Sequence, residues 1–174
     1  MRILGIDPGS RHTGYGVIEA SGRRLAYVDA GAISPRLGAP FSQRLLAIYQ
    51  SMTERIEALR PSQVAVEDLF HSVNSRSALR LAHVRGVLIL AAGAAGLAVT
   101  AYAPAAIKKA VVGSGNAAKE QVAWMVSRLL EKPMAHRTLD TTDALAVAIC
   151  HASHLGPGPR RNGGSGRSAV GRSR

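Results

Sequence analysis

The sequence predicts one α/β domain in which a mixed five-stranded sheet is flanked by helices. Two observations indicate this. Three strand-like segments follow one another with only short turns between them, as in an antiparallel meander. The later strand-like segments are separated by stretches with helical periodicity, which is typical of parallel strands joined by helices. The 174 residues, 47% of them hydrophobic, suffice for one core and argue against a disordered chain.

The first half of the chain supplies four of the five expected strands. Residues 2–7 (RILGID), 13–20 (TGYGVIEA) and 24–33 (RLAYVDAGAI) form the predicted meander. A helix is expected after Pro40, because apolar residues at 45, 49, 52, 56 and 59 share one helical face, and Arg60-Pro61 ends it. Residues 63–67 (QVAVE) are the fourth strand, which again runs from apolar residues into an acid.

The second half is expected to be mostly helical. Helices are predicted at 75–95, 105–112 and 118–130, a strand at 97–102, and a last helix from about 141 to 151. The 22 residues from Gly86 to Ile107 carry no charge and are long enough to span a bilayer. Their Ala and Gly content and Pro104 favour a buried helix followed by a strand, so no membrane span is expected. Asp7 interrupts the first apolar stretch too early for a signal peptide, which indicates a cytoplasmic protein.

The charge of the chain favours a polyanionic partner. Lys and Arg outnumber Asp and Glu by 22 to 11, giving a formal charge of +11. Residues 156–174 (GPGPRRNGGSGRSAVGRSR) hold five arginines and no acid. We expect them to be a disordered basic tail after a domain of residues 1–155, either binding the partner or only aiding solubility. The single cysteine, Cys150 in ALAVAIC, excludes an internal disulfide and is expected to be a buried, inert thiol.

Acidic residues stand at the ends of three apolar elements. Asp7 ends the first strand, Glu67 ends the fourth, and Asp140 and Asp143 open the last helix at i, i+3. Each has a purely structural alternative. Asp7-Pro8-Gly9 also fits a turn, Glu67 a solvated strand end, and Asp140 an N-cap with Asp143 near the positive helix end. If the two strands are parallel neighbours, however, the carboxylates meet at one edge of the sheet.

Such a cluster needs cations. Two like charges ~4 Å apart repel by about 4 kcal/mol at an effective dielectric of 20, and a phosphate would add further repulsion. Oxygen ligands without His or Cys suit Mg²⁺ or Mn²⁺. Two divalent ions would make the site attractive to phosphate and would support phosphodiester cleavage. The predicted site therefore holds two Mg²⁺ ions, with Mn²⁺ as a substitute.

Four motifs, in order, resemble the RuvC family of bacterial Holliday junction resolvases. They are LGIDPGSRHTGYGVI, VAVEDLFHSVNSRSALRLAHVRGV, VVGSGNAAKEQV and DTTDALAVAICH, and the match covers roughly residues 1–152. The resemblance implies a ribonuclease H-like fold and a homodimer. It also implies Mg²⁺-dependent endonuclease activity that makes paired nicks in four-way DNA junctions during recombination and repair, beside the RuvAB branch-migration complex.

The resemblance also implies roles for individual residues. Asp7, Glu67, Asp140 and Asp143 match the family's acidic catalytic and metal-binding positions. Phe70 matches an aromatic that acts against unstacked bases, and Lys108 and Lys119 match basic positions near the cut. Arg76 lies in the loop of Phe70 and is expected to contact phosphate. The alternatives are that Phe70 belongs to the core and that the lysines are solvated helix residues.

Other interpretations fit less well. GIDPGS also resembles the first phosphate loop of actin-like ATPases and sugar kinases, but the chain lacks a second lobe. The YqgF-like family shares the first strand, but not the VVGSGNAAKEQV region or the length. A junction-binding protein without activity would not need four intact acids.

For the dimer, a stripe on helix 75–95 offers an interface, unless it faces its own sheet. The stripe consists of Leu79, Ala82, Gly86, Ile89 and Gly93.

Overall fold

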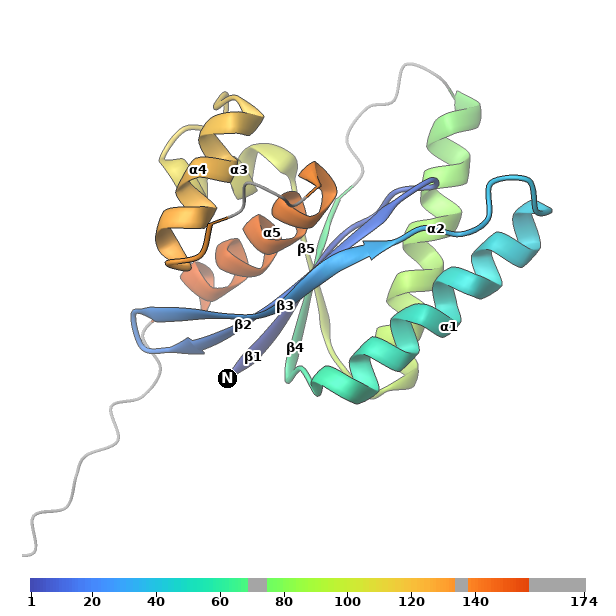
Figure 1. Cartoon of the computed structure of the whole chain (residues 1–174), viewed down its shortest axis with the longest axis horizontal. Coiled ribbons are helices and arrows are strands. Elements are labelled where there is room, and N and C mark those ends of the chain that lie inside the picture. The colour runs from blue at the N-terminus through green and yellow to red at the C-terminus, as the bar shows by residue number, and fades with distance from the viewer. Residues whose placement is uncertain (69–74, 134–137, 157–174) are drawn as a thin grey trace, which may run out of the picture.

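The computed structural model describes residues 1–68, 75–133 and 138–156. Five strands form one sheet in the order β3-β2-β1-β4-β5 (Figure 1). The elements in chain order are β1 (Arg2–Asp7), β2 (Thr13–Ser21), β3 (Arg24–Ile33), α1 (Phe41–Leu59), β4 (Gln63–Glu67), α2 (Ser75–Ala94), β5 (Val99–Tyr102), α3 (Pro104–Val112), α4 (Lys119–Leu129) and α5 (Leu139–Leu155). The predicted mixed five-stranded sheet is confirmed.

The pairing of the strands fixes which chain ends lie together. β1, β2 and β3 form the predicted antiparallel meander, and β1 pairs with β4 in parallel. β4 also pairs in parallel with the edge strand β5. The carboxyl ends of β1 and β4 therefore lie side by side, and each ends in an acid, so the condition under which the sequence brings the two carboxylates together is met.

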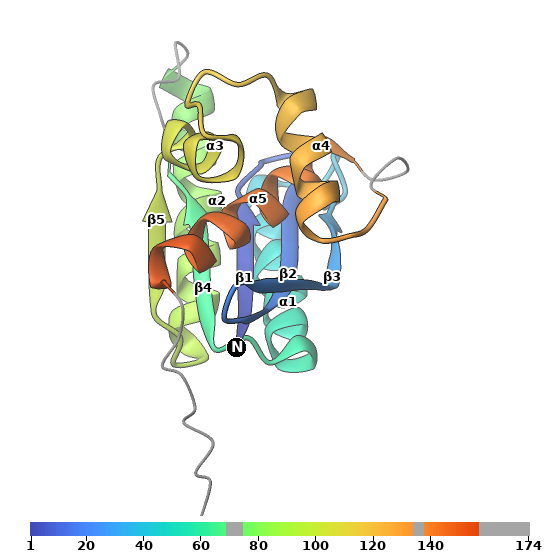
Figure 2. The ribbon, with the colours of Figure 1, turned by 90° about the vertical axis from the view of Figure 1, so that its left-hand side faces the viewer.

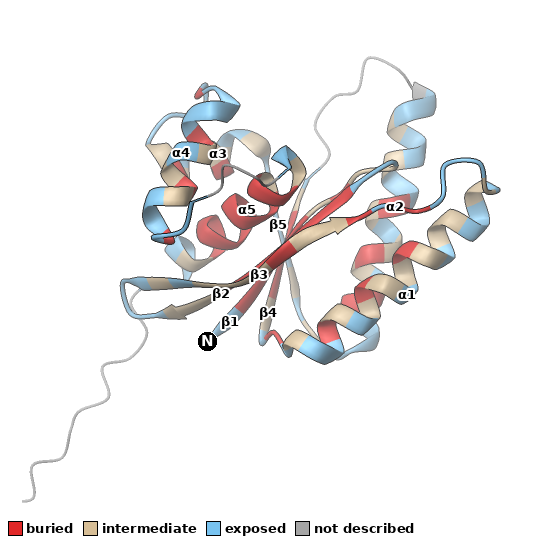
Figure 3. Cartoon of the chain, in the orientation of Figure 1, coloured by how far each residue is buried: buried red, intermediate tan, exposed pale blue. Residues whose placement is uncertain are grey.

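Helices cover both faces of the sheet. α1 and α2 pack on one face, and α3, α4 and α5 pack on the other (Figures 1 and 2). Because β1 is covered on both sides, its side chains are buried without alternation: Ile3, Leu4 and Ile6 are each at most 1% exposed. Figure 3 shows this buried centre along β1, β4 and α5.

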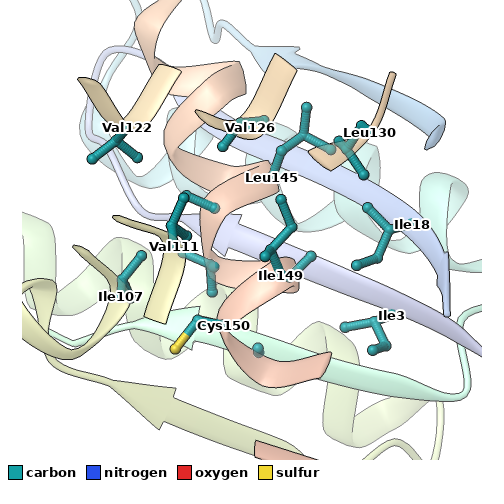
Figure 4. Packing of buried hydrophobic residues seen from close by; sticks show 14 of the residues in the cluster. Ile3, Ile18, Ile107, Val111, Val122, Val126, Leu130, Leu145, Ile149 and Cys150 are labelled. Atoms are coloured by element: carbon teal, nitrogen blue, oxygen red, sulfur yellow. The ribbon is translucent and has the colours of Figure 1, made fainter. Parts of the chain in front are cut away.

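The helix α5 is the most enclosed helix of the chain, with every residue from Ala144 to His151 buried. Leu145, Ile149 and Cys150 pack among residues of α3, α4 and the sheet, such as Val111, Val122 and Ile3 (Figure 4). Cys150 is buried, and this burial raises its thiol pKa to about 11. The expectation of a buried thiol is confirmed, and its raised pKa favours the unreactive protonated form.

Two glycines let α5 approach the sheet closely. A Cβ on Gly5 would lie 2.1 Å from the backbone oxygen of Ala144, and one on Gly14 would lie 2.1 Å from that of Asp140. Only hydrogen fits at these positions. Gly5 and Gly14 therefore let the start of α5 pack directly on β1, which carries Asp7, and on the neighbouring strand β2.

The strand β5 and the helix α5 differ from the sequence prediction by two residues or more. β5 begins at Val99 rather than residue 97, because Gly96 ends α2 in a left-handed conformation and Leu97 still bonds to Ala92. α5 begins at Leu139 and continues to Leu155. Its N-cap is Thr138, whose carbonyl accepts the amide hydrogen of Thr142. The alternative that made Asp140 the N-cap is therefore wrong, and its carboxylate is free of that role.

The segment Arg76–Ala94 of α2 is long and apolar enough to cross a membrane, with a mean hydropathy of 1.3. It nevertheless forms part of the domain. Val84, Leu88, Ala91 and Ala92 pack in the core shared with α1 and the sheet. Only 22% of the segment is buried, so its other side is uncovered within one chain.

Candidate active site

Asp7 and Glu67 stand next to each other at the carboxyl ends of β1 and β4. Ile6 and Val66 are paired in the parallel ladder, so the residues that follow them end their two strands side by side. A hydrogen bond joins the two carboxyl groups. Asp7, at the end of a buried strand, is thus hydrogen-bonded to a second acid.

The start of α5 brings two more carboxylates to this edge. Asp140 and Asp143 occupy the first turns of the helix, and the backbone of Asp140 lies against Gly14, the residue paired with Asp7. The charges of Asp143 and Asp140 both act on Asp7. Four acids from β1, β4 and α5 therefore form one electrostatic cluster, as the sequence predicted.

The pKa of Asp7 shows how crowded this negative charge is. Burial, then the charge of Glu67, their mutual hydrogen bond and the charges of Asp143 and Asp140 raise the pKa of Asp7 to about 8. Burial also raises the pKa of Glu67, although the hydrogen bond from Asp7 opposes it. Without a cation, the Asp7 carboxyl group is protonated at neutral pH and donates a hydrogen bond to the Glu67 carboxylate.

Two lysines face the acids from α3 and α4. Lys119 Nζ lies 2.9 Å from Asp143 Oδ2, and this hydrogen bond raises the pKa of Lys119. Lys119 and Lys108 both act to lower the pKa of Glu67. Since Lys119 is 58% exposed, the pair adds little to stability. Its placement instead puts a cation where a phosphate would meet the carboxylates.

One pocket of about 240 Å³ joins these groups. Its lining includes Asp7, Glu67, Asp143, Lys108 and Lys119, with apolar side chains of α3 and α4 such as Ile107 and Val122 behind them. Asp140 is not part of the lining but acts on Asp7 through its charge. Arg76 is exposed on α2 and does not line the pocket, and Phe70 lies outside the described residues.

The four acidic side chains are not arranged with the geometry of a metal-binding site within the described residues. Within residues 1–68, 75–133 and 138–156, no three His, Cys, Asp or Glu side chains already form a metal-holding group. The side-chain contacts account for this, because Asp143 is drawn to Lys119 and Asp7 is hydrogen-bonded to Glu67. The raised pKa of Asp7 nevertheless fits a cation site, since oxygen donors crowded without compensation suit a hard divalent cation.

Comparison with known proteins supports the same conclusion. The family model described as "Crossover junction endodeoxyribonuclease RuvC" matches residues 3–151. The chain belongs to the RuvC family. The RuvC of Azorhizobium caulinodans is 47% identical over 161 residues, covering 92% of this chain and 95% of that protein. The RuvC of Syntrophotalea carbinolica is 53% identical over 152 residues, covering 87% and 94%.

A solved RuvC structure confirms the ribonuclease H-like fold. The structure titled "T. thermophilus RuvC in complex with Holliday junction substrate" superposes with a TM-score of 0.84 at 35% identity, covering 89% of this chain and 94% of that one. The fold and family expected from the four motifs are therefore confirmed.

Sequence reasoning missed two contacts that support this RuvC-type site. Arg85 of α2 pairs with Asp68, the residue after Glu67. The hydroxyl of Tyr102, which is paired with Glu67 in the sheet, lies 2.9 Å from Nδ1 of the buried His151 on α5. The sequence holds no periodic or spacing signal for either contact, because each joins segments brought together only by the tertiary fold.

Proposed function

We propose that this RuvC-family chain is a Holliday junction resolvase, an endonuclease that hydrolyses phosphodiester bonds in four-way DNA junctions. The observation that carries the proposal is the convergence of Asp7, Glu67, Asp140 and Asp143 beside Lys108 and Lys119. We assign the four acids as catalytic and metal-binding residues. A recombination and repair enzyme of this kind would act in the cytoplasm, on chromosomal junctions.

We propose Mg²⁺ as the cofactor, with two ions per site and Mn²⁺ as a substitute. The donor set is carboxylate oxygen only, which fits these ions better than Zn²⁺ or Cu²⁺. When bound, such ions activate a water and stabilise the leaving oxygen in phosphodiester hydrolysis. Asp7 and Glu67, at adjacent strand ends, and Asp143, on α5, line the pocket and would hold them.

The chain's own groups position and neutralise the substrate. Lys108 and Lys119 line the same pocket as the acids, so a phosphate that enters meets cations on the α3 and α4 side. The ion pair with Asp143 holds the Lys119 ammonium at this pocket and raises its pKa, which further favours the charged form. We assign Lys108, Lys119, Arg76 and Phe70 to DNA binding, the last from the family motif alone.

We further propose that the enzyme acts as a homodimer through α2. Paired nicks need two active sites, and a two-fold dimer supplies them on a junction of similar symmetry. The predicted stripe does not face its own sheet: Leu79 is 61% exposed, and a Cβ on Gly86 or Gly93 would meet nothing within 4 Å. Leu90, also 61% exposed, widens this uncovered apolar face. The RuvAB complex is proposed as a partner from family resemblance.

Cleavage of a synthetic four-way junction tests the proposed function. The purified chain should bind the junction with Ca²⁺ or Mg²⁺ and should nick two opposing strands only with Mg²⁺ or Mn²⁺. Asp7→Asn serves as the matched inactive variant and should bind without nicking. Binding without nicking by the wild-type chain under all metals would identify a junction-binding protein instead, and equal nicking of linear duplex would identify a general nuclease.

A further inference from the structure

Two loops beside the active site carry positive charge and contain no acid of their own. Residues 8–12 follow Asp7 directly, and residues 34–40 follow the end of β3, where Ile33 pairs with Thr13. Arg11 and Arg36 are exposed in these loops, and Arg44 lies in the first turns of α1. The chain has no Asp or Glu at residues 8–18 or 30–53. We call these loops and three arginines the arginine platform.

Hydrogen bonds join the platform into one unit. Nδ1 of His12 lies 2.8 Å from the hydroxyl oxygen of Ser34, which ties the two loops together. The guanidinium of Arg44 donates to the carbonyl of Ser10, which ties α1 to the first loop. Preorganised cations lose less conformational freedom on binding than cations on loose loops, so this bonding favours a fixed ligand surface.

The surroundings add to the positive potential. α1 begins after Pro40 with no side-chain cap and no acid in its first turn, so its free amide groups contribute partial positive charge. The guanidinium of Arg80 lies 6.0 Å from the ring centroid of Phe41 at the start of this helix. Asp68, the nearest acid after Glu67, is paired with Arg85.

Arg36 and Arg44 of the platform belong to the α1 side of the carboxylates, opposite the active-site lysines. Lys108 and Lys119 come from α3 and α4, which cover one face of the sheet, while residues 34–40 lead into α1 on the other face (Figures 1 and 2). A scissile phosphate at the acids contacts the lysines. The backbone that reaches the platform therefore belongs to DNA lying across the sheet edge on the α1 side.

We infer that the arginine platform binds the phosphate backbone of a second, uncut arm of the junction and so contributes to preference for four-way over linear DNA. The inference rests on the proposed function. A linear duplex can contact only the carboxylates and the surface of Lys108 and Lys119. A junction presents a second arm, which can reach the arginine platform on the other side of the carboxylates. Loss of the platform should thus weaken junction binding more than duplex binding.

The test removes two exposed platform charges and compares them with two matched charges elsewhere. The double variant Arg11→Ala/Arg36→Ala is compared with Arg23→Ala/Arg24→Ala, which removes two exposed arginines from the β2–β3 turn at the far end of the sheet. Affinity for a four-way junction and for linear duplex of the same sequence is measured in Ca²⁺ at several salt concentrations. Thermal melting checks that both variants fold.

The platform variant should lose roughly tenfold or more in junction affinity. The slope of its log K against log salt should become shallower by about 0.9 for every phosphate that the variant no longer neutralises. The control variant should change junction affinity less than twofold. Restoring the charges with Arg11→Lys/Arg36→Lys should recover most of the binding. Equal losses in platform and control variants, or equal losses for junction and duplex, would overturn the inference.

Failure of the proposed function has a different signature. If the wild-type chain binds junctions in Ca²⁺ but never nicks them in Mg²⁺, the enzymatic proposal fails, and the platform comparison still decides the inference. If the wild-type chain shows no preference for junctions over duplex, the inference is overturned together with the resolvase proposal.

Discussion

Arg85 and Asp68 connect the uncovered helix α2 to the strand end that carries Glu67. Arg85 Nη2 lies 3.1 Å from Asp68 Oδ1, and the backbone amide of Asp68 donates to the carbonyl of Tyr102 at 2.8 Å. Asp68 is thus held by α2 through its side chain and by β5 through its backbone. Glu67, which precedes it, is fixed in position at the edge where the carboxylates meet.

We predict that Asp68→Ala slows cleavage without weakening junction binding. The Asp68 side chain is 52% exposed, so loss of the ion pair should cost only about 1 kcal/mol of folding free energy or less. A small displacement of a catalytic group can reduce the rate far more, and we expect roughly a tenfold lower kcat. Single-turnover nicking at saturating Mg²⁺, together with junction Kd in Ca²⁺, measures both.

The matched control is Glu19→Ala, which breaks the ion pairs with Arg2 and the N-terminus at the opposite end of β1. It should melt slightly lower and cleave at the wild-type rate. The double variant Asp68→Ala/Arg85→Ala should be no slower than Asp68→Ala alone if the two residues act as a pair. Equal rates for Asp68→Ala and wild type would show that Glu67 needs no such support.

A second prediction concerns Asp7 and pH. Its folded-state pKa is raised from 3.8 to about 8, so the folded state favours the protonated acid. The stability gained from this protonation is fully present below pH 3.8 and is lost as the pH rises through about 8. In EDTA, the melting temperature of wild type relative to Asp7→Asn should therefore fall as the pH rises from about 4 to about 8 and should level off above the raised pKa.

Asp7→Asn should also abolish cleavage while junction binding survives or improves, because one negative charge near the phosphate is gone. Melting curves of both proteins across this pH range, with and without Mg²⁺, provide the measurement. Added Mg²⁺ should raise the melting temperature of wild type more than that of Asp7→Asn near the raised pKa of Asp7. A constant difference between the two proteins at all pH values would mean that Asp7 is not crowded by other acids.

The strand-end acids could be predicted from the sequence, whereas their closest partners could not. Asp7 and Glu67 each end a short apolar run, and parallel pairing of those runs follows from the βα order, so their meeting was foreseeable. The ion pair of Lys119 with Asp143 was not, since 24 residues separate them and the relative position of α4 and α5 depends on packing. The family motif marked Lys119 as basic near the cut, without its partner.

The last helix shows a similar limit. Its apolar composition predicts burial, but the sequence prediction starts the helix near residue 141, and the structural alternative for Asp140 makes that residue the N-cap. Thr138 takes that position instead, and α5 lies on β1 and β2 because Gly5 and Gly14 lack side chains. Close backbone approach between distant segments leaves no periodic signal, and a strand glycine alone does not say what approaches it.

This close approach gives a third prediction. Gly14→Ala should destabilise the protein by at least about 1–3 kcal/mol, because the added Cβ lies 2.1 Å from the backbone oxygen of Asp140 and forces α5 away from β2. Cleavage should fall further than stability alone explains, since Asp140 and Asp143 move with the helix. Urea unfolding and nicking at a temperature where the variant is folded separate these effects. Gly38→Ala, with nothing within 4 Å of its Cβ, is the control for stability and should unfold at the same urea concentration as wild type.

The final prediction concerns α2 and the dimer. The helix buries Val84, Leu88, Ala91 and Ala92 in its own domain, while Leu79, Gly86 and Leu90 are exposed on it. A second copy of the same face would cover this apolar stripe, and the open space around Gly86 would let two helices approach closely. Gly86→Arg should therefore give a folded monomer, because the arginine fills that space while leaving the core side untouched.

Sedimentation at micromolar concentration should show a dimer for wild type and a monomer for Gly86→Arg. The melting curves of the two proteins should be similar apart from the contribution of dimer dissociation in wild type. On a junction in Mg²⁺, wild type should give paired nicks from one binding event, and the variant should give only single, uncoupled nicks. The matched control is Arg60→Ala, which changes one exposed residue beyond the end of α1 and should stay dimeric. A wild-type chain that sediments as a monomer yet still cuts in pairs on a bound junction would replace the preformed dimer with assembly on DNA.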